Sequence, residues 1–587
     1  MIQLTSLSYA HLRNILCVFS IVVLVGLLSS STVALAQPIN PIPAFPGAEG
    51  HGALALNTCD RNDVKVIQVT NLNSSGPGTL RDAIENQLRK GKLDIIIFRT
   101  GGTIHSTGEI RISNNCVYIA GQTAPGDGIQ IRGKRSDLTF DYRFGRANNI
   151  VVRYLRLRAE KEGEVGRNDV VTIFGSNDII LDHVSMQWGN DAIMDIYGRL
   201  NEWNASDIYN VTIQRSIMAE GVKPHSTGML LGDYSAGGHY PTYDVSLHHN
   251  VFAHNSHRNP RGGSTRTQIA NNIVYNWKHR AGSTLGDAEW DYVNNTYIKG
   301  PWTRTNSPDY RWLRHEPCFP GKPPYPETPS IYIDGNIFGS GATSDADQWT
   351  RIRQSFTCTT NYSAQEELPI AWRRTTPLDD APVPVTVQSA ADARDSVLAD
   401  VGANQRLDCD GSWVWVQDRV DIDIIQDIQQ GTGPATDEEN DNPSDYGGFP
   451  ILDQGTPCAD SDSDGMPDEW EQRYFASMTA AAVNADTDSD GYTNIEEYLN
   501  GTNPVGPIPG AGPTFLPGMG SPVQDLDGDG KAEDLNGNGR FDFADVVAFF
   551  QYLDSQVVQA NSNDFDFTGD GLVDMADVRE LFFVALY

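Results

Sequence analysis

A short β-rich run with one polar residue at a fixed place recurs along this chain, and this repeat constrains the fold more than any other feature. Examples are "NDIILDHVSM", "YNVTIQRSIM", "YDVSLHHNVF" and "TQIANNIVYN". Aligned on their middle, successive runs are 22 to 41 residues apart and place these residues in register: His183, Ser216, Asn250, Asn272, Asn295 and Asn336. Strands repeated with loops of variable length are typical of a solenoid, in which stacked Asn side chains hydrogen-bond from coil to coil. We therefore predict an all-β chain folded as a parallel β-helix.

A β-sandwich or a propeller would also be rich in short strands. Both need hairpin turns or a steadier period than this chain has. Helix-like sequence is scarce, and its one clear stretch is "GTLRDAIENQL" at residues 78–88. We assign residues 37–430 to one β-helix domain, in which residues 340–430 complete or cap the solenoid.

The first 36 residues have the form of an export signal. An apolar run from Ile15 to Leu28 follows Arg13, and Ala34-Leu35-Ala36 has the small-x-small pattern of a cleavage site. No later stretch approaches the roughly 18 apolar residues of a membrane span, so we expect a soluble extracellular protein cleaved near Ala36. The mature chain keeps six cysteines, enough for up to three disulfides, and no C-x-x-C pair that would suggest a thiolate metal site. They are Cys59, Cys116, Cys318, Cys358, Cys409 and Cys458.

The formal net charge of −33 belongs mainly to the C-terminal quarter of the chain. Residues 437–587 contain 31 acidic and 4 basic residues, a net of −27, which leaves −6 for residues 1–436. An acidic tail is typical of a solvated or cation-binding segment. A nearly neutral body with such a tail argues against nucleic-acid binding.

Four acidic loops in this tail match the twelve-residue calcium loop, which has oxygen ligands at positions 1, 3, 5, 9 and 12 and Gly at position 6. One match would be a weak signal, but four in one tail are hard to obtain by chance. We place EF-hand-like calcium repeats at residues 458–502, between linkers at 431–457 and 503–523, and a second module at 524–587. The ligands in chain order are Asp460, Asp462, Asp464, Asp468 and Glu471; Asp486, Asp488, Asp490, Asn494 and Glu497; Asp534, Asn536, Asn538, Asp542 and Asp545; and Asp566, Thr568, Asp570, Asp574 and Asp577.

The two loops of residues 524–587 are 32 residues apart, end in Asp, and each leads into an apolar helix ("VVAFFQYL" and "VRELFFVAL"). This module resembles a dockerin, and the earlier pair resembles the calcium repeats appended to exported bacterial enzymes. Both resemblances imply folding that depends on calcium, and the first implies a protein partner. The alternative is an acidic flexible tail.

The β-helix itself carries three aspartates with the chemistry of a cation site. In "LDHVSMQWGNDAIMDIYG", Asp191 and Asp195 are four residues apart and Asp182 precedes them. Their carboxylates can converge on calcium, which prefers hard oxygen ligands. The alternative is that each aspartate only caps backbone amides in a β-turn.

Two basic stretches follow on successive turns of the expected solenoid. "AEGVKPHSTG" contains Lys223 and His225, and "HRNPRGG" contains Arg258 and Arg261 on either side of Pro260. The residue before a proline is held extended, which fixes the separation of the two arginines. Guanidinium groups bind carboxylates through paired hydrogen bonds, so the second stretch predicts an anion site. Two solvated arginines in a turn are the alternative.

Several motifs occur together and in order: "PAFPGAEGHGA", "VTNLNSSGPGTLRDAI", "IAGQTAPGDGIQI", "VVRYLRLR", "LDHVSMQW", "SLHHNVFAHNSHRNPR" and "NNIVYNW". Over residues 45–339, about half of the chain, they resemble polysaccharide lyase family 1, the pectate lyases. The resemblance implies a right-handed parallel β-helix and calcium-dependent β-elimination of polygalacturonate. It assigns calcium to Asp182, Asp191 and Asp195. It makes Arg258 the base and gives substrate binding to Lys223 and Arg261.

Arginine is a poor base by its reference pKa. Arg258 could instead clamp the substrate while water or a neighbouring histidine takes the proton. His249, His254 and His257 are expected to be structural or to line the rim. Three other functions stay open: a lyase for another uronan, a β-helix glycoside hydrolase with paired carboxylates, and a non-catalytic glycan-binding adhesin. A monomer is expected in each case.

Overall fold

The computed structural model describes residues 41–585 apart from some short segments. The segments left out are 134–137, 142–146, 161–168, 199–206, 233–240, 305–311, 318–327, 340, 342–346, 356–364, 379, 436–439, 441, 480, 506–515, 517–520, 527–530, 554, 556–557, 559–561 and 569–572. The predicted export signal, Cys318, Cys358 and Asp570 therefore lie outside the described residues.

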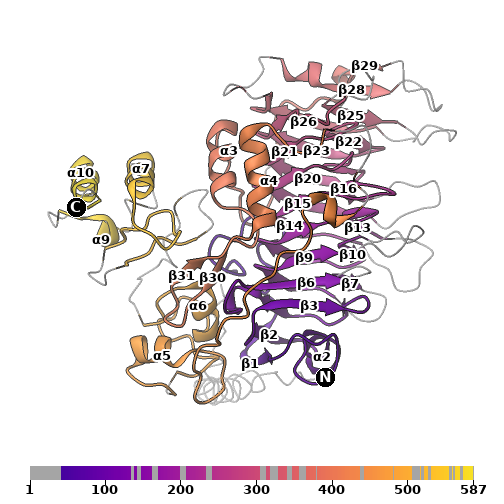
Figure 1. Ribbon diagram of the computed structural model, residues 1–587. Helices are drawn as coiled ribbons and strands as arrows, with labels where there is room; N and C mark the ends of the chain where they lie inside the picture. Colours follow the sequence, from indigo (N-terminus) through magenta and orange to yellow (C-terminus); the bar gives the residue numbers. More distant parts are fainter. Residues whose placement is uncertain are drawn as a thin grey trace, which may run out of the picture. The chain divides into compact units, whose positions relative to one another are not determined.

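The strands stack in parallel into three sheets, and each coil of the chain contributes one strand to each sheet (Figure 1). From β2 onward, a strand pairs with the strand three places further along, as Leu181 pairs with Ile213 and Ile213 with Leu247. This arrangement is a parallel β-helix, and it confirms the predicted fold class.

The first sheet contains β1 (Asp60–Val69), β2 (Lys92–Phe98), β5 (Val117–Ala120), β8 (Ile150–Arg153), β11 (Ile179–Asp182), β14 (Val211–Gln214), β17 (Tyr243–His248), β20 (Thr265–Ala270), β23 (Glu289–Val293) and β26 (Ser330–Asp334). The second contains β3 (Gly102–Ser106), β6 (Ile129–Gly133), β9 (Arg156–Ala159), β12 (Ser185–Gln187), β15 (Ile217–Ala219), β18 (Val251–Ala253), β21 (Ile273–Tyr275), β24 (Thr296–Ile298) and β27 (Ile337–Phe338). The third contains β4 (Arg111–Ile112), β7 (Leu138–Asp141), β10 (Val171–Phe174), β13 (Ala192–Tyr197), β16 (Thr227–Leu231), β19 (Arg261–Gly262), β22 (Gly282–Leu285), β25 (Leu313–Glu316), β28 (Ile352–Ser355) and the antiparallel β29 (Gln365–Glu367).

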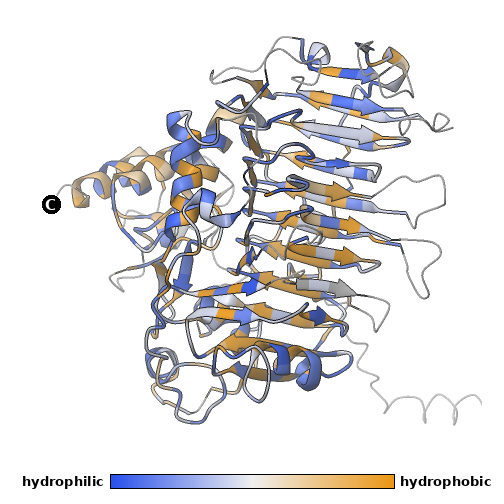
Figure 2. Cartoon of the chain, turned by 45° about the vertical axis from the view of Figure 1, so that its right-hand side comes forward, coloured by the Kyte–Doolittle hydropathy of each residue, from blue (hydrophilic) through white to orange (hydrophobic). Residues whose placement is uncertain are grey.

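Aliphatic side chains from all three sheets fill the interior of the coils. Leu181, Met186 and Ile196 come from the first, second and third sheet, respectively, and all three are completely buried in one cluster. Hydrophobic stretches run along the stacked strands in Figure 2. Each such side chain stabilises the fold by roughly 1.5–3 kcal/mol on burial, so the repeated strand pattern in the sequence is the pattern of this core.

An amide ladder crosses the turn between the first and second sheets. Each side-chain oxygen accepts a hydrogen bond from the backbone N–H one coil earlier. The pairs are Asn250 to Ser216 at 2.9 Å, Asn272 to Asn250 at 3.0 Å, Asn295 to Asn272 at 2.9 Å and Asn336 to Asn295 at 2.9 Å. The predicted ladder is confirmed for these five residues, and Gln348 extends it by one step.

His183, which the sequence alignment placed at the start of this ladder, does not belong to it. Val184 occupies that position, and its N–H donates to the hydroxyl of Ser216 at 3.0 Å. His183 is the preceding corner residue, has a left-handed backbone (φ +52°), and stacks on Tyr154 with ring centroids 4.7 Å apart. A slip of one residue exchanges inside for outside, so this prediction was wrong.

Later parts of the chain cover the outer faces of two sheets. Helices α3 (Ala390–Ala399) and α4 (Arg419–Gln430) pack against the second sheet, with Val397 and Ile424 in the same cluster as Ala219 and Val251. Residues 44–56 and parts of segment 458–502 share a cluster with outer residues of the first sheet. Within the described parts of the chain, no hydrophobic cluster lies on the outer face of the third sheet.

The remaining elements lie mainly in the C-terminal part. They are α2 (Leu80–Asp82), which continues into a π-helical turn at Ala83–Gln87, the hairpin β30 (Gln405–Leu407) and β31 (Trp413–Trp415), and α5 (Asp468–Phe475), α6 (Asn494–Asn500), α7 (Phe543–Tyr552), α9 (Ser562–Phe565) and α10 (Met575–Val584). Two disulfides join Cys59 to Cys116 and Cys409 to Cys458. In the segment expected to be a linker, Phe449 packs against Trp188, with ring centroids 4.6 Å apart. None of the described helices has the length and apolar character needed to cross a membrane.

Candidate active site

The outer face of the third sheet presents a row of side chains, most of which are buried. Cross-strand pairing aligns Thr172, Asp195, Leu230, Arg261, Ser283 and Arg314 along successive coils. The row is acidic at Asp195 and basic at Arg261 and Arg314. A polyanion lying along the row would therefore meet favourable charge at one end and would need a cation at the other.

Two further aspartates join Asp195 because each directly precedes a strand of the third sheet. Asp169 lies just before β10 and Asp191 just before β13. Asp169 accepts hydrogen bonds from the Ala192 N–H at 3.1 Å and from the Thr172 hydroxyl at 3.2 Å. The Oδ1 atom of Asp195 is buried and has no hydrogen-bond partner among the described residues.

The three carboxylates act on one another electrostatically. Burial, together with the charge of Asp191, raises the pKa of Asp169 to about 7. Burial and Asp169 raise the pKa of Asp195 well above its ordinary value. Like charges held this close favour protonation unless a cation is bound between them. The oxygen-only donor set and the orphaned Oδ1 of Asp195 fit a hard divalent cation such as calcium.

The arrangement is looser than a closed metal site. Among the described residues, the groups of His, Cys, Asp or Glu whose ligand atoms all lie within 4.8 Å of one another are found elsewhere in the molecule. One reason is that Asp191 is hydrogen-bonded to Nδ1 of His225. Asp191 would therefore exchange this contact when it binds a cation.

Arg258 lies beside the carboxylates, as the "HRNPRGG" motif suggested. Its carbonyl accepts from the Met229 N–H at 2.6 Å, and the next residue, Asn259, donates to the Ala281 carbonyl at 2.8 Å. The motif is thus fixed between β16 and β22, with a cis bond between Asn259 and Pro260. The charge of Arg258 opposes the rise in the pKa of both Asp169 and Asp195.

Three histidines border this place. His257 lies between His225 and His279, with ring centroids 5.5 and 6.2 Å away. Burial and the charges of Arg280 and Arg258 hold the pKa of His257 well below its ordinary value. His257 is therefore neutral at physiological pH, and its buried Nδ1 atom has no hydrogen-bond partner among the described atoms.

Arg261 lies in a different setting from Arg258. Its side chain is buried and donates to Glu316 at 2.9 Å. Arg280 and Arg314 reach the other oxygen of Glu316 at 3.1 and 3.2 Å. Glu316 thus gathers three guanidinium groups on the outer face of the third sheet. Sequence reasoning missed Glu316, and the substrate-binding role of Arg261 stays a prediction.

Lys223 lies in the loop between β15 and β16, and its backbone N–H donates to the carbonyl of Asn440 at 2.9 Å. The loop also carries His225, whose contact with Asp191 brings it next to the three carboxylates. The structure therefore places Lys223 two residues from a member of the site. Its substrate-binding role stays a prediction.

Asp182 is not part of the carboxylate group, although the sequence placed it there. It ends β11 in the first sheet, whereas Asp191 and Asp195 belong to the third. Its side chain is 1% exposed and is bound by Arg153 at 2.7 Å and Gln214 at 2.8 Å. A carboxylate that already has a buried guanidinium partner needs no metal, so the assignment of calcium to Asp182 was wrong.

Asp169 is the carboxylate that sequence reasoning missed, and a signal for it existed. It precedes the strand "VVTIF" as Asp191 precedes "AIMDI", and the two aspartates are 22 residues apart. That distance equals the shortest step of the polar repeat. Aligning the third strand of each coil, and not only the first, would have placed Asp169 beside Asp191.

The acidic loops of the tail divide into two kinds. In the first two loops, the ligand atoms of Asp460, Asp462 and Asp464, and those of Asp486, Asp488 and Asp490, lie within 4.8 Å of one another. In the last two loops, Asp545 and Asp577 are occupied as helix caps, accepting from the N–H groups of Asp542 and Asp574 at 2.8 Å. Calcium binding at all four loops stays a prediction.

Comparison with known proteins identifies relatives of this chain. No family model matches it. A probable pectate lyase C of Aspergillus flavus is 32% identical over 480 residues, covering 81% of this chain and 97% of the relative. The corresponding proteins of Aspergillus terreus and Emericella nidulans are each 31% identical, covering 82% and 80% of this chain and 98% and 96% of themselves. Residues 1–430 alone could not supply such coverage, so the shared region extends into the tail.

Solved structures with a similar fold include a pectate lyase from Bacillus sp. N165 in complex with trigalacturonate, at 16% identity and a TM-score of 0.40 over 61% of this chain and 98% of that one. The major allergen of cedar pollen has 14% identity and a TM-score of 0.34 over 60% of this chain and 94% of that one. The sequence relatives cover most of this chain and nearly all of their own length at more than 30% identity. The chain therefore belongs to the pectate lyase family and is a polysaccharide lyase.

Proposed function

We propose that this chain cleaves polygalacturonate by calcium-dependent β-elimination and releases oligogalacturonides with a 4,5-unsaturated end. The observation that carries the proposal is the grouping of Asp169, Asp191 and Asp195 with Arg258 at the outer face of the third sheet. The probable pectate lyases C among the relatives support the same substrate.

The residues at this place suit the chemistry of the reaction. The C-5 hydrogen of a uronate is only weakly acidic, because its removal adds charge to a molecule that already carries a carboxylate. Asp169, Asp191 and Asp195 would hold calcium, which when bound neutralises the substrate carboxylate and the negative charge that develops. Arg258 lies next to these carboxylates and would face C-5 of the bound sugar. Loss of the C-5 proton and cleavage of the C-4–O-4 bond then give the double bond.

Two residues compete for the role of proton acceptor. Arg258 is the base in our proposal, on its position beside the carboxylates. His257 is the alternative, because its neutral imidazole carries a free nitrogen lone pair close to Arg258. An arginine base predicts a rate that keeps rising into strongly alkaline pH, whereas a neutral His257 predicts a rate that is level above pH 7.

The test is an assay of polygalacturonate with and without calcium, followed by near-ultraviolet absorbance of unsaturated products. We expect absorbance that requires calcium, with a loss of about 10²–10⁴-fold in kcat for Arg258→Ala. The control His257→Gln should keep most of the activity. New reducing ends without absorbance would indicate a hydrolase and contradict the proposal. Neither signal would point to another uronan or to a binding protein.

We also propose that the protein is exported. The first 36 residues support this, as do the two disulfides, since structural disulfides persist mainly in oxidising compartments. N-terminal sequencing of the secreted protein should begin at Gln37. A mature protein that still begins at Met1 would contradict export through this signal.

A further inference from the structure

Two acidic loops of segment 458–502 have ligand groups already gathered around a point. The carboxylate oxygens of Asp460, Asp462 and Asp464 lie within 4.8 Å of one another, as do those of the second loop, which begins at Asp486. Calcium binds oxygen ligands at about 2.3–2.6 Å. Two ligands on opposite sides of one ion are then about 4.8 Å apart, so each group has the size of a calcium shell.

A second and independent observation points into each loop. Glu471 and Glu497, at position 12 of the two loops, are 0% and 1% exposed. The Oε2 atom of each is buried and has no hydrogen-bond partner among the described atoms. The charges of Asp464 and Asp462 act on Glu471, and those of Asp488 and Asp490 on Glu497. A buried carboxylate oxygen without a partner is costly, and a bound cation removes that cost.

The loops are built into the outer face of the first sheet. A Cβ atom on Gly465, at position 6 of the first loop, would lie 2.6 Å from a side-chain carbon of Val66, so the loop backbone lies directly on β1. Trp470, which follows in α5, is fully buried in one cluster with Ile95 and Tyr118 of the first sheet. Burial of that tryptophan depends on the fold of the loop that positions it.

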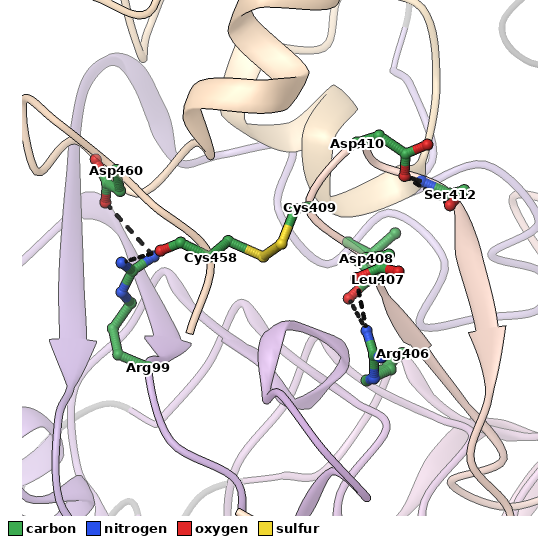
Figure 3. Close-up of a disulfide and its surroundings, with 9 residues drawn as sticks. All are labelled: Arg99, Arg406, Leu407, Asp408, Cys409, Asp410, Ser412, Cys458 and Asp460. Atoms are coloured by element: carbon green, nitrogen blue, oxygen red, sulfur yellow. Dashed lines mark hydrogen bonds and ion pairs between the residues drawn. A yellow bond between two sulfur atoms is a disulfide. The ribbon is translucent and has the colours of Figure 1, made fainter. Parts of the chain in front are cut away.

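Polar contacts also join the two loops to the β-helix. Arg61 pairs with Glu496 at 3.0 Å, and Gln122 donates to the carbonyl of Leu499 at 3.2 Å. Figure 3 shows Arg99 reaching both the carbonyl of Cys458, at 2.5 Å, and Asp460, at 3.8 Å, next to the Cys409–Cys458 disulfide. Both loops are therefore connected to the first coils of the β-helix.

We infer that two calcium-class divalent cations, one in each loop, hold segment 458–502 against the first sheet, and that this segment is a metal-dependent clamp on the catalytic β-helix. The clamp is distinct from the proposed catalytic cation, which concerns the third sheet. Cations that bind only the folded loops stabilise the whole chain, because the cluster around Trp470 belongs to both parts.

The test uses the full-length protein with Glu471→Gln and Glu497→Gln, singly and together, and Glu469→Gln as the control. Glu469 is in the same loop but is exposed and occupies no ligand position. Calcium chloride should raise the Tm of the wild type by about 5 °C when both sites are saturated 100-fold above Kd. The control should show the same shift, and the double variant should lose most of it and bind two fewer ions in equilibrium dialysis.

These variants should fold, because glutamine keeps the shape of glutamate and removes a buried unpaired charge. In the calcium-free protein the Tm of the double variant should accordingly be no lower than that of the wild type. An unchanged number of bound ions would overturn the inference. Loss of two ions with a full calcium-dependent Tm shift would overturn it as well. Neither readout requires substrate, so a failure here is separable from a failure of the proposed lyase activity.

Discussion

The role of a buried aspartate in this chain depends on which positive charge neutralises it. Asp182 has the guanidinium of Arg153 at 2.7 Å and is closed off from solvent. Asp195 has an oxygen without a partner among the described residues and two aspartates nearby. The first is a structural ion pair, and the second is prepared for an external cation.

Substitution of these two kinds of aspartate should affect different properties, the calcium requirement in one case and the stability in the other. Asp169→Asn is expected to raise the calcium concentration needed for half-maximal elimination at least tenfold with little loss of stability. Asp182→Asn leaves Arg153 without its partner and should lower the free energy of unfolding by about 3–5 kcal/mol, with an unchanged calcium requirement. Calcium titration of the rate and urea unfolding measure the two effects. A raised calcium requirement in Asp182→Asn would contradict our correction.

The pH dependence of stability follows from the same pair. Burial alone would raise the pKa of Asp182, but His183 and Arg153 outweigh it and hold this pKa well below its ordinary value. A carboxyl with a depressed pKa contributes stability above its unfolded pKa of about 4 and loses it as the pH falls further. The acid side of the stability curve should therefore be shallower in Asp182→Asn than in the wild type.

Sequence reasoning predicted some residues of the proposed site and missed others for a physical reason. Asp191, Asp195 and Arg258 were predicted from motifs and spacings that each lie within a short stretch of sequence. Asp169 and Glu316 act only through neighbours that are distant in the sequence, since Asp169 meets Asp195 on the next coil and Glu316 meets Arg261 two coils away. Pairing across coils cannot be read from one strand at a time.

At the scale of elements, the amide ladder sets the register of the coils. The polar residue repeated at a fixed place in successive runs predicted the β-helix, and a strand that slips by one residue would expose its whole core face. The position of His183 shows the limit of that reasoning. The corner residue and the ladder residue are adjacent, and only the backbone conformation tells them apart.

Removal of one rung of the ladder should destabilise the solenoid without changing its chemistry. Asn272 donates to the carbonyls of Leu247 at 2.8 Å and Ala270 at 3.0 Å, and it accepts from Asn250. Asn272→Ala leaves these buried groups unpaired, so we expect a loss of about 2–5 kcal/mol in urea unfolding. The exposed Asn86→Ala is the control, with a change near zero. Equal stability of the two variants would contradict a structural role for the ladder.

At the scale of the whole molecule, the tail and the helices after the last coils cover two of the three sheets. Helices α3 and α4 cover the second sheet, and segment 458–502 covers the first. The sequence could not show this arrangement, because both coverings join residues that are far apart in the sequence. Trp470 meets Tyr118, for example, and Ile424 meets Ala219. The proposed lyase site lies on the third sheet, which neither of these segments covers.

Removing each disulfide in turn tests whether the cations hold the clamp independently of a covalent cross-link. Cys409–Cys458 closes a loop of 49 residues at the edge of the clamp, and Cys59–Cys116 closes a loop of 57 residues. Loop entropy depends weakly on length, so loss of either bond should cost about 4 kcal/mol in the presence of calcium. The double substitutions Cys409→Ser with Cys458→Ser and Cys59→Ser with Cys116→Ser test this by thermal unfolding.

Calcium removal should then distinguish the two variants. Without Cys409–Cys458, the cations, the apolar cluster and the polar contacts hold segment 458–502 on the first sheet, so chelation should loosen the segment and expose it to protease. The Cys59–Cys116 variant keeps its covalent link to the segment and should resist cleavage there under the same conditions. Equal cleavage of both variants would mean that the disulfide does not anchor the clamp.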